Sequence, residues 1–131
     1  MIVADASAVT AALAVDDEQG ERARARLSVD VDQHAPGILD LEVASAIRRL
    51  LRTGVIDGPR ADRALADLVV LPLERYPHVA LLPRVWELRD NLTPYDAAYV
   101  ALAEALGAVL VTADARLAGA PGPCCAIEVL R

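Results

Sequence analysis

Two apolar stretches of this chain each stop at an aspartate. The first, "MIVAD" at residues 1–5, ends on Asp5, and the second, "VLVTAD" at 109–114, ends on Asp114. Carboxylates can bind metal ions or transfer protons. If both stretches are strands of one parallel sheet, both acids lie at its carboxyl edge, where open α/β sheets bind their ligands.

Two further acids are expected at the same edge. Glu42 lies in the first turn of a helix predicted over 39–52, directly after a short strand. Asp96 lies in the first turn of a helix that ends at Gly107 and leads into the amino end of the 108–112 strand. A helix that returns to the amino edge must start at the carboxyl edge. The topology therefore brings four acids to one rim: Asp5, Glu42, Asp96 and Asp114.

The elements that must position these acids alternate along the chain. Apolar runs predict strands at Ile2–Ala4, Gln33–Ala35, Val69–Leu73, Ala108–Thr112 and Ala126–Val129. Helical periodicity is found over 7–14, 18–27, 39–52, 60–68, 79–89 and 95–106. This alternation predicts a single α/β domain over residues 1–131. Its mainly parallel central sheet should have four to five strands, with helices on both faces.

Two of the helical segments carry more detailed expectations. Thr93 is an N-cap candidate, Pro94 suits the first helical position and Gly107 closes the helix. The 79–89 segment is expected to contribute four side chains to the core: Leu82, Val85, Trp86 and Leu88.

Each acid also has a purely structural explanation. Asp5 and Asp114 can cap the short helices that follow them, and Glu42 suits the positive end of a helix dipole. Asp96 follows Thr93 by three residues, as in a capping box. Together, however, four like charges repel one another and raise each other's pKa. A fold has little reason to gather them without a cation, and an all-oxygen ligand set suits Mg²⁺ or Mn²⁺ rather than zinc.

Two hydroxyl side chains accompany the strand-end acids. Ser7 follows Asp5 by two residues, and Thr112 precedes Asp114 by two. Such hydroxyls can position a water or an acid, and they can equally satisfy the local backbone. The sequence leaves both interpretations open.

The composition excludes several other site chemistries. The net charge is −6, and the 13 basic residues are all arginine. Receiver domains and haloacid-dehalogenase-type phosphatases require a lysine, and in the latter a D-x-D motif stands where this chain has Asp5-Ala-Ser. A P-loop needs Gly-Lys, and no G-x-G-x-x-G is present either. Phosphoacceptor, P-loop and dinucleotide sites are therefore not supported.

The cysteines, histidines and apolar runs point to no other kind of site. Cys124 and Cys125 are adjacent, so they cannot link distant segments, and there is no C-x-x-C to bind zinc. His34 and His78 are isolated in the sequence, which does not favour a two-histidine site. The longest apolar run, Ala97–Ala103, is too short to span a bilayer, and no signal peptide is evident. A cytoplasmic protein is expected.

With these motifs in place, the chain resembles PIN-domain ribonucleases, and most of all the VapC toxins of bacterial toxin–antitoxin pairs. The resemblance covers essentially the whole chain. It is carried by "IVADAS" at 2–7, "DLEVASAIRR" at 40–49, "LTPYDAAYVALAEALGAVLVTAD" at 92–114 and the "ARLA" that follows. The third segment is the most specific. The resemblance implies a PIN-like three-layer α/β/α fold.

The resemblance also implies roles for particular residues. The metal-site acids of the family fall on Asp5, Glu42, Asp96 and Asp114, and its small hydroxyl residues fall on Ser7 and Thr112. Many members carry a further acid where this chain has Arg116, so a fifth ligand is absent and either one or two metal ions are conceivable. Asp40 lies two residues from the matching position and is interpreted as a helix-start residue.

The activity implied is that of an endoribonuclease dependent on Mg²⁺ or Mn²⁺, which acts as the toxin of a type II pair on structured tRNA or rRNA. Arg48, Arg49, Arg52 and Arg116 are the candidate RNA-binding residues. Further basic margins are offered by Arg22, Arg24, Arg26, Arg60 and Arg63, although these arginines equally suit solvated helix faces.

The resemblance implies partners as well. A VapB-like antitoxin and a second copy of the chain are expected, with no membrane. Apolar side chains on the 39–52 and 60–68 helices and near Trp86 are candidates both for these contacts and for the core. The competing interpretation of the whole chain is a non-catalytic PIN-like module that binds RNA or protein.

Overall fold

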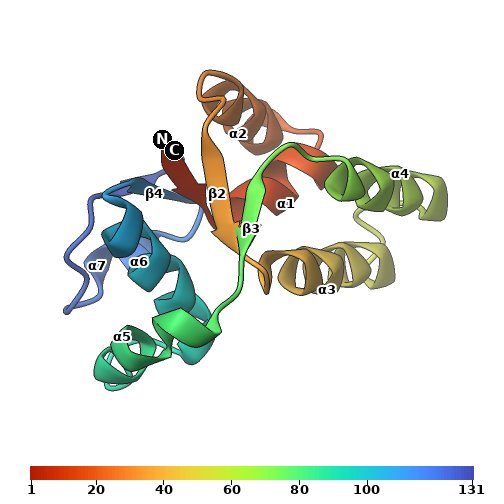
Figure 1. Ribbon diagram of the computed structural model, residues 1–131. Coiled ribbons are helices and arrows are strands. Elements are labelled where there is room, and N and C mark those ends of the chain that lie inside the picture. The colour runs from red at the N-terminus through yellow and green to blue at the C-terminus, as the bar shows by residue number, and fades with distance from the viewer.

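A computed structural model describes residues 1–131 and has one five-stranded sheet (Figure 1). The strand order is β3-β2-β1-β4-β5, and every neighbouring pair is parallel. The strands are β1 (Ile2–Ala4), β2 (Gln33–Pro36), β3 (Glu74–Tyr76), β4 (Val109–Thr112) and β5 (Ile127–Val129). The helices are α1 (Ala6–Ala14), α2 (Glu18–Ser28), α3 (Leu39–Arg52), α4 (Gly58–Val69), η1 (Val79–Leu81), α5 (Leu82–Glu87), α6 (Pro94–Leu106) and α7 (Ala115–Gly119).

The sheet is buried between two layers of helices, as an all-parallel sheet requires. Helix α6 packs on β1, β2 and β4, with α5 beside it. Helix α1 packs on β4 and contacts α2, α3 and α4, which lie together on the other side of the sheet (Figure 1). The predicted three-layer α/β/α architecture is therefore confirmed. No helix is both long and apolar enough to cross a bilayer.

The central strands are apolar because both of their faces are covered. Every residue of β1 is buried, and so are the last three residues of β4. In register, Val3 lies beside Leu110, and Ala4 lies beside Val111. Asp5 and Asp114 follow these two paired strands, so the pairing brings the two stretches of chain that carry them to the same edge.

Helix α6 begins and ends where the sequence predicts. Thr93 is its N-cap and accepts a hydrogen bond from the Asp96 amide at 3.2 Å, with Pro94 at the first helical position. Gly107 closes the helix in the left-handed conformation, with φ of 65°. Because these caps fix the first turn, they fix the place of Asp96.

The third strand is not where the sequence analysis placed it. Residues 69–73 were expected to be a strand, whereas α4 continues to Val69 and β3 is Glu74–Tyr76. Val69 and Val70 are 74% and 75% exposed. The apolar run was misleading because β3 is an edge strand with partly exposed side chains, and an edge strand needs no continuous apolar sequence.

The 79–89 segment was also only partly predicted. It forms η1 followed by the short helix α5. Val85 and Leu88 are buried as expected, but Leu82 and Trp86 are 48% and 65% exposed. Trp86 lies against the Arg89 guanidinium, which is 5.0 Å from the ring centroid. A helix of six residues can turn only a narrow face to the core, so the expectation that Leu82 and Trp86 are core residues is wrong.

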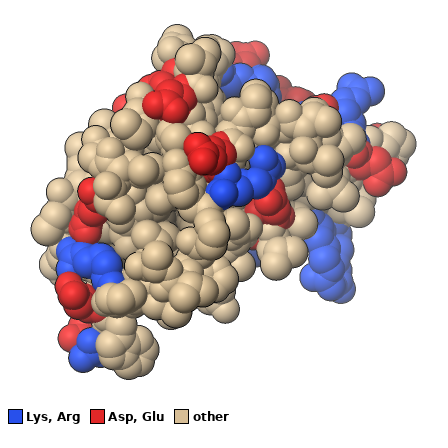
Figure 2. Space-filling model, viewed as in Figure 1, with Lys and Arg blue, Asp and Glu red and all other residues tan.

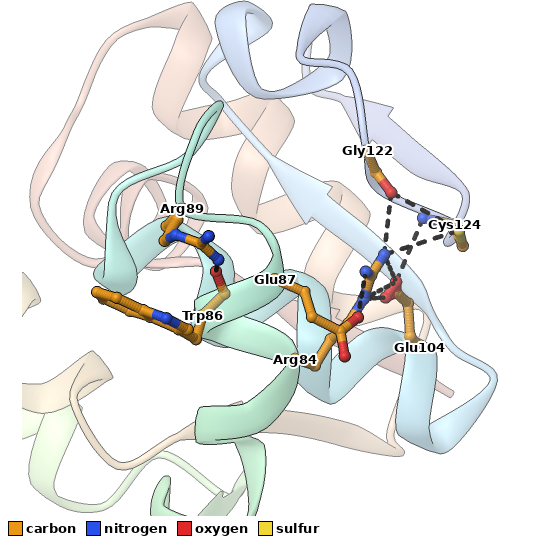
Figure 3. A network of polar contacts seen from close by, with 7 residues as sticks. All are labelled: Arg84, Trp86, Glu87, Arg89, Glu104, Gly122 and Cys124. Atoms are coloured by element: carbon orange, nitrogen blue, oxygen red, sulfur yellow. Dashed lines mark hydrogen bonds and ion pairs between the residues drawn. The ribbon is translucent and has the colours of Figure 1, made fainter.

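A network around Arg84 fastens the end of the chain to α5 and α6 (Figure 3). The guanidinium of Arg84 donates to Glu104 Oε1 at 2.8 Å, to Glu87 Oε2 at 3.1 Å and to the carbonyl of Gly122 at 3.0 Å. The amide of Cys124 donates to the same Glu104 at 3.3 Å. The network holds the segment between α7 and β5, where the free Cys124 is exposed.

Candidate active site

Asp5 is the most buried of the four predicted acids, with 6% of its surface exposed. It is the N-cap of α1, and its Oδ1 accepts from the Ala8 amide at 3.1 Å. The same oxygen accepts from Ser7 Oγ at 2.6 Å, and Oδ2 accepts from Thr112 Oγ1 at 2.5 Å. Both carboxylate oxygens are thus held by donors from two chain segments, which fixes the side chain.

The two hydroxyls also bind the backbone that leads to the last acid. Ser7 Oγ accepts from the Ala113 amide at 2.9 Å, and Thr112 Oγ1 accepts from the Asp114 amide at 2.9 Å. Each hydroxyl therefore donates to Asp5 and accepts from the turn after β4. The sequence left two uses open for these hydroxyls, and the structure shows both: they hold an acid and satisfy the local backbone.

Glu42 is in the first turn of α3, on the other helical layer from α6. Its Oε1 accepts from the hydroxyl of Tyr99 at 2.6 Å. Tyr99 lies in α6, three residues after Asp96, and is 2% exposed. This hydrogen bond joins the two helical layers beyond the carboxyl ends of the strands.

Asp114 lies on the outer side of the group and pairs with Arg116. It caps the short helix α7 by accepting from the Arg116 amide at 3.0 Å. The Arg116 guanidinium donates to both Asp114 oxygens, at 3.2 and 3.0 Å. With Thr93, these residues and Asp96 line one cleft of about 260 Å³. The structure thus brings Asp96 and Asp114 to the same hollow.

The acids act on one another electrostatically. Burial raises the pKa of Asp5, against the hydrogen bonds from Ser7 and Thr112, and the charge of Asp96 raises it further. Burial likewise raises the pKa of Glu42, with added repulsion from Asp96 and Asp5. Burial and the charge of Asp114 raise the pKa of Asp96. Arg116 has the opposite effect on its partner, because its hydrogen bonds lower the pKa of Asp114.

This set of oxygen donors suits a hard divalent cation, although the four carboxylates are not arranged around one common position. All four side chains offer oxygen ligands, which Mg²⁺ and Mn²⁺ prefer. No three carboxylate, imidazole or thiol side chains lie close enough to hold one ion as they stand. Three of the carboxylates already have partners in the protein: Asp5 accepts from two hydroxyls, Glu42 from Tyr99 and Asp114 from Arg116. Their roles as metal ligands stay a prediction.

The candidate RNA-binding arginines differ in how free they are. Arg22, Arg26 and Arg60 form ion pairs with Glu18, Glu128 and Asp16, and Arg24 donates to two backbone carbonyls. Arg48, Arg49 and Arg52 all lie on α3, and none of them forms an ion pair or a side-chain hydrogen bond. Arg49 lines a cleft of about 430 Å³ together with Ser7 and Glu42. Figure 2 shows small mixed groups of charge and no broad basic area on the face in view.

A hollow larger than the two clefts beside the acids lies elsewhere. A concavity of about 730 Å³ lies between α1, α2 and α4, beside the residues that precede β2 and β3. It contains none of the four acids, and its Arg60 is already paired with Asp16. The four candidate ligands lie instead at the carboxyl edge of the sheet, so a larger volume does not make this concavity the candidate site.

No role was predicted for Tyr99 from the sequence. The signal was available, because a buried tyrosine needs a partner for its hydroxyl. Tyr99 is also one helical turn after Asp96, so it shares that face of α6.

His34, isolated in sequence, lies between Asp32 and the hydroxyl of Tyr76, each at 2.6 Å from a ring nitrogen.

Comparison with known proteins defines the class. The PIN domain family model matches residues 2–122, which is nearly the whole chain, so the chain belongs to the PIN-domain family. Within that family it is similar to VapC ribonucleases. It is 46% identical to Ribonuclease VapC9 of Mycobacterium tuberculosis over 134 residues, which cover 99% of this chain and 98% of that protein. It is 44% identical to Ribonuclease VapC1 of the same organism, over 98% and 97% of the two chains. The predicted resemblance is confirmed.

Solved structures agree on the fold. The crystal structure of Mycobacterium tuberculosis VapC20, described as a "Sarcin-Ricin loop cleaving toxin", superposes with a TM-score of 0.71 at 16% identity, covering 91% of this chain and 94% of that one. FitAcB from Neisseria gonorrhoeae gives a TM-score of 0.72 at 16% identity, with 97% and 96% covered. At these identities, the likeness establishes the three-layer fold alone.

Proposed function

We propose that this chain is a metal-dependent endoribonuclease that acts as the toxin of a type II toxin–antitoxin pair. The proposal rests on four acids from four chain segments, whose charges act on one another near one edge of the sheet: Asp5, Glu42, Asp96 and Asp114. The chain that arranges them is similar over nearly its full length to VapC ribonucleases. The proposal treats residues 1–131 as one PIN domain.

The residues that would hold Mg²⁺ or Mn²⁺ are Asp5, Glu42, Asp96 and Asp114. A bound divalent ion supplies an oriented water and stabilises the charge on the attacked phosphate. The chain itself contributes the fixed carboxylate of Asp5, which Ser7 and Thr112 hold in place. No protein nucleophile is needed. Asp114 must turn away from Arg116 before it can bind a cation, and this frees Arg116 to meet a phosphate.

The substrate proposed is a structured RNA with an unpaired loop, such as a tRNA or rRNA loop. Unpaired loops expose a reachable backbone. Arg49, in the same cleft as Glu42, is the best-placed of the proposed phosphate contacts, with Arg48 and Arg52 on the same helix. Few free arginines on an acidic protein give a weak affinity, and each contact of an arginine with a phosphate makes that affinity fall further as salt increases. The cytoplasm, which contains such RNA, is the proposed place of action.

A VapB-like antitoxin and a second copy of the chain are the proposed protein partners. Some of the apolar side chains that were candidates for these contacts are buried in the core, and others are exposed. Val43 and Ile47 of α3 are buried, whereas Leu41 and Leu51 are exposed. Leu65 of α4 is exposed as well, at 45%. The exposed set, together with Leu82 and Trp86, supports the proposal of a protein contact.

Cleavage of RNA by variants of the acids tests the proposal. A broad RNA pool is incubated with the protein with and without Mg²⁺, for the wild type, Asp5→Asn, Asp96→Asn and the control Asp62→Asn. Asp62 is an exposed carboxylate of α4 with no partner. We expect cleavage only with Mg²⁺, a loss of at least about 100-fold in the two site variants, and full activity in the control.

The alternative function, a non-catalytic binding module, gives a different result. In that case, the wild type and both site variants are equally inert on the RNA pool while all four proteins remain folded by circular dichroism. The intact set of acids favours the enzyme. Sequencing the 5′ ends of cellular RNA after expression of the active protein would then identify the RNA and the position of the cut.

A further inference from the structure

One polar contact joins Glu42 to a buried side chain of α6. The hydroxyl of Tyr99 donates to Glu42 Oε1 at 2.6 Å, a short hydrogen bond to a charged acceptor. Tyr99 is 2% exposed, so its ring is fixed by the core around α6. The contact spans 57 positions of sequence and joins α6 to α3.

The hydrogen bond distinguishes the two oxygens of Glu42. Oε1 is held by Tyr99, while Oε2 has no hydrogen-bond partner in the protein. Glu42 lines the cleft that also contains Ser7 and Arg49. Tyr99 therefore engages one defined oxygen of Glu42 and leaves the other without a hydrogen-bond partner in the protein. Without the hydroxyl, the carboxylate could rotate, or Oε1 would stay half-buried with no donor, at a cost.

We propose that Tyr99 is a positioning residue, which holds Glu42 through Oε1 so that Oε2 faces the cation at the carboxyl edge. This inference rests on the proposed metal site. Groups that form a hydrogen bond with a metal ligand hold it in orientation and increase the affinity for the metal. Their loss typically weakens metal binding by about 10- to 100-fold. Tyr99 suits this role because its hydroxyl can donate from a ring that the core does not allow to move.

The other two tyrosines of the chain provide matched controls. Tyr76 donates to or accepts from His34 Nδ1 at 2.6 Å, so Tyr76→Phe also loses a short side-chain hydrogen bond, but on the edge strand. Tyr95 neighbours Asp96 and is 58% exposed, so Tyr95→Phe removes a hydroxyl near the acids and breaks no hydrogen bond within the protein. Neither residue belongs to the proposed machinery.

The test measures metal binding directly as well as activity. Mn²⁺ is titrated into each protein by calorimetry, and the Mg²⁺ concentration at half-maximal RNA cleavage is determined. For Tyr99→Phe, we expect the Mn²⁺ dissociation constant and the Mg²⁺ requirement to rise by about tenfold or more. Cleavage at saturating Mg²⁺ should fall much less. Both control variants should match the wild type in metal binding.

A double-mutant cycle shows whether Tyr99 acts through Glu42. In the Glu42→Gln background, Tyr99→Phe should weaken Mn²⁺ binding no further, because the ligand that it positions is already altered. An effect of Tyr99→Phe equal to that of Tyr76→Phe, or an undiminished effect in the Glu42→Gln background, would overturn the positioning role.

The readouts also separate this inference from the proposed function. If the wild type binds Mn²⁺, Tyr99→Phe weakens that binding and no RNA is cut, the positioning role holds and the nuclease proposal fails. If RNA is cut and Tyr99→Phe leaves the metal requirement unchanged, only the positioning role fails. A wild type that neither binds Mn²⁺ nor cuts RNA overturns both.

Discussion

Asp5 combines deep burial with several hydrogen-bond donors to its carboxylate. Its carboxylate is nearly inaccessible, and burial raises its pKa. Two hydroxyls and a backbone amide nevertheless donate to it, which favours the charged form. The protein therefore devotes three donors to an acid that a purely structural N-cap would not need to bury so deeply.

Replacement of Asp96 by a neutral residue should raise the stability of the metal-free protein and reduce its RNA cleavage. Burial and the charge of Asp114 raise the pKa of Asp96, so its ionised form is disfavoured in the folded state. That net shift outweighs the favourable effect of an acid at the start of α6. We expect Asp96→Asn to raise the Tm by a few degrees without divalent ions and to reduce the rise in Tm that Mg²⁺ produces.

The control for this measurement is Asp62→Asn, which should leave the Tm and its response to Mg²⁺ unchanged. A Tm of Asp96→Asn at or below that of the wild type in metal-free buffer would show that the charge of Asp96 does not strain the fold.

Arg116 makes a second prediction, because it competes with a cation for Asp114. Its guanidinium binds both Asp114 oxygens, yet its side chain is 91% exposed. Arg116→Ala should therefore lower the Mg²⁺ concentration at half-maximal cleavage by roughly threefold. The same change should raise the KM for RNA and reduce its salt dependence, since one phosphate contact is lost.

The two effects of Arg116→Ala have opposite signs, so they are separately measurable in one titration of Mg²⁺ and one of RNA. The matched control is Arg89→Ala, a change in an exposed arginine that stacks on Trp86 and is not among the proposed RNA contacts. A higher Mg²⁺ requirement in Arg116→Ala would contradict the competition.

The sequence was sufficient to predict which residues gather at the edge, and insufficient to predict how they are held. Apolar runs that stop at Asp5 and Asp114 reveal strand ends, and helix signals place Glu42 and Asp96. The pairing of Tyr99 with Glu42 and of Arg116 with Asp114 depends on side-chain orientation. That orientation is set by packing and not by spacing.

Among the helices, the contact between α1 and α2 depends on a glycine. A Cβ at Gly20 would lie 1.7 Å from the carbonyl oxygen of Val15, just beyond the end of α1. No side-chain rearrangement relieves a collision with backbone, so α2 must move away from α1. We expect Gly20→Ala to lower the free energy of unfolding by at least about 2 kcal/mol.

The control is Gly58→Ala in the first turn of α4, where a Cβ would meet no heavy atom within 4 Å. That change should be neutral or stabilising by about 0.5 kcal/mol. Urea denaturation of both variants tests the contrast. Equal stabilities of the two variants would contradict the close approach of α1 and α2.

The edge strand β3 shows why one element could not be predicted. Its position depends on Arg75, which donates to Asp40 at 2.9 Å and to the carbonyl of Leu68 at the end of α4, also at 2.9 Å. These contacts join β3 to α3 and α4, and parallel pairing holds it beside β2, whereas the local sequence favours a strand at residues 69–73. Asp40 lies in the first turn of α3, as predicted, and its carboxylate is bound by Arg75.

At the scale of the whole molecule, the parallel sheet makes the site possible. Parallel strands bring all their carboxyl ends to one edge, and α6 must begin there because it returns to the amino end of β4. Each layer of helices then contributes one acid, Glu42 from α3 and Asp96 from α6. Concentrating negative charge at this edge costs stability, and that cost should depend on pH.

The direction of the pH dependence follows from the raised pKa values of Asp5, Glu42 and Asp96. The folded state holds these protons more tightly than the unfolded chain. Their contribution to stability is therefore fully present below the ordinary values of 3.8 for Asp and 4.5 for Glu, and it is lost as the pH rises through the raised values. Asp114, whose pKa is lowered, acts oppositely, and its contribution is lost below 3.8.

Mg²⁺ should restore what these acids lose, but only where they are ionised. We expect millimolar Mg²⁺ to raise the Tm clearly at pH ~7.5 and only slightly at pH ~3.5, which lies below the ordinary pKa values of 3.8 for Asp and 4.5 for Glu, so that protons neutralise the raised-pKa acids. Thermal unfolding at both pH values tests this, with NaCl at matched ionic strength as the control for screening. An equal rise in Tm at both pH values, or the same rise with NaCl, would mean that Mg²⁺ acts on the protein surface in general and not on the carboxylates gathered at the sheet edge.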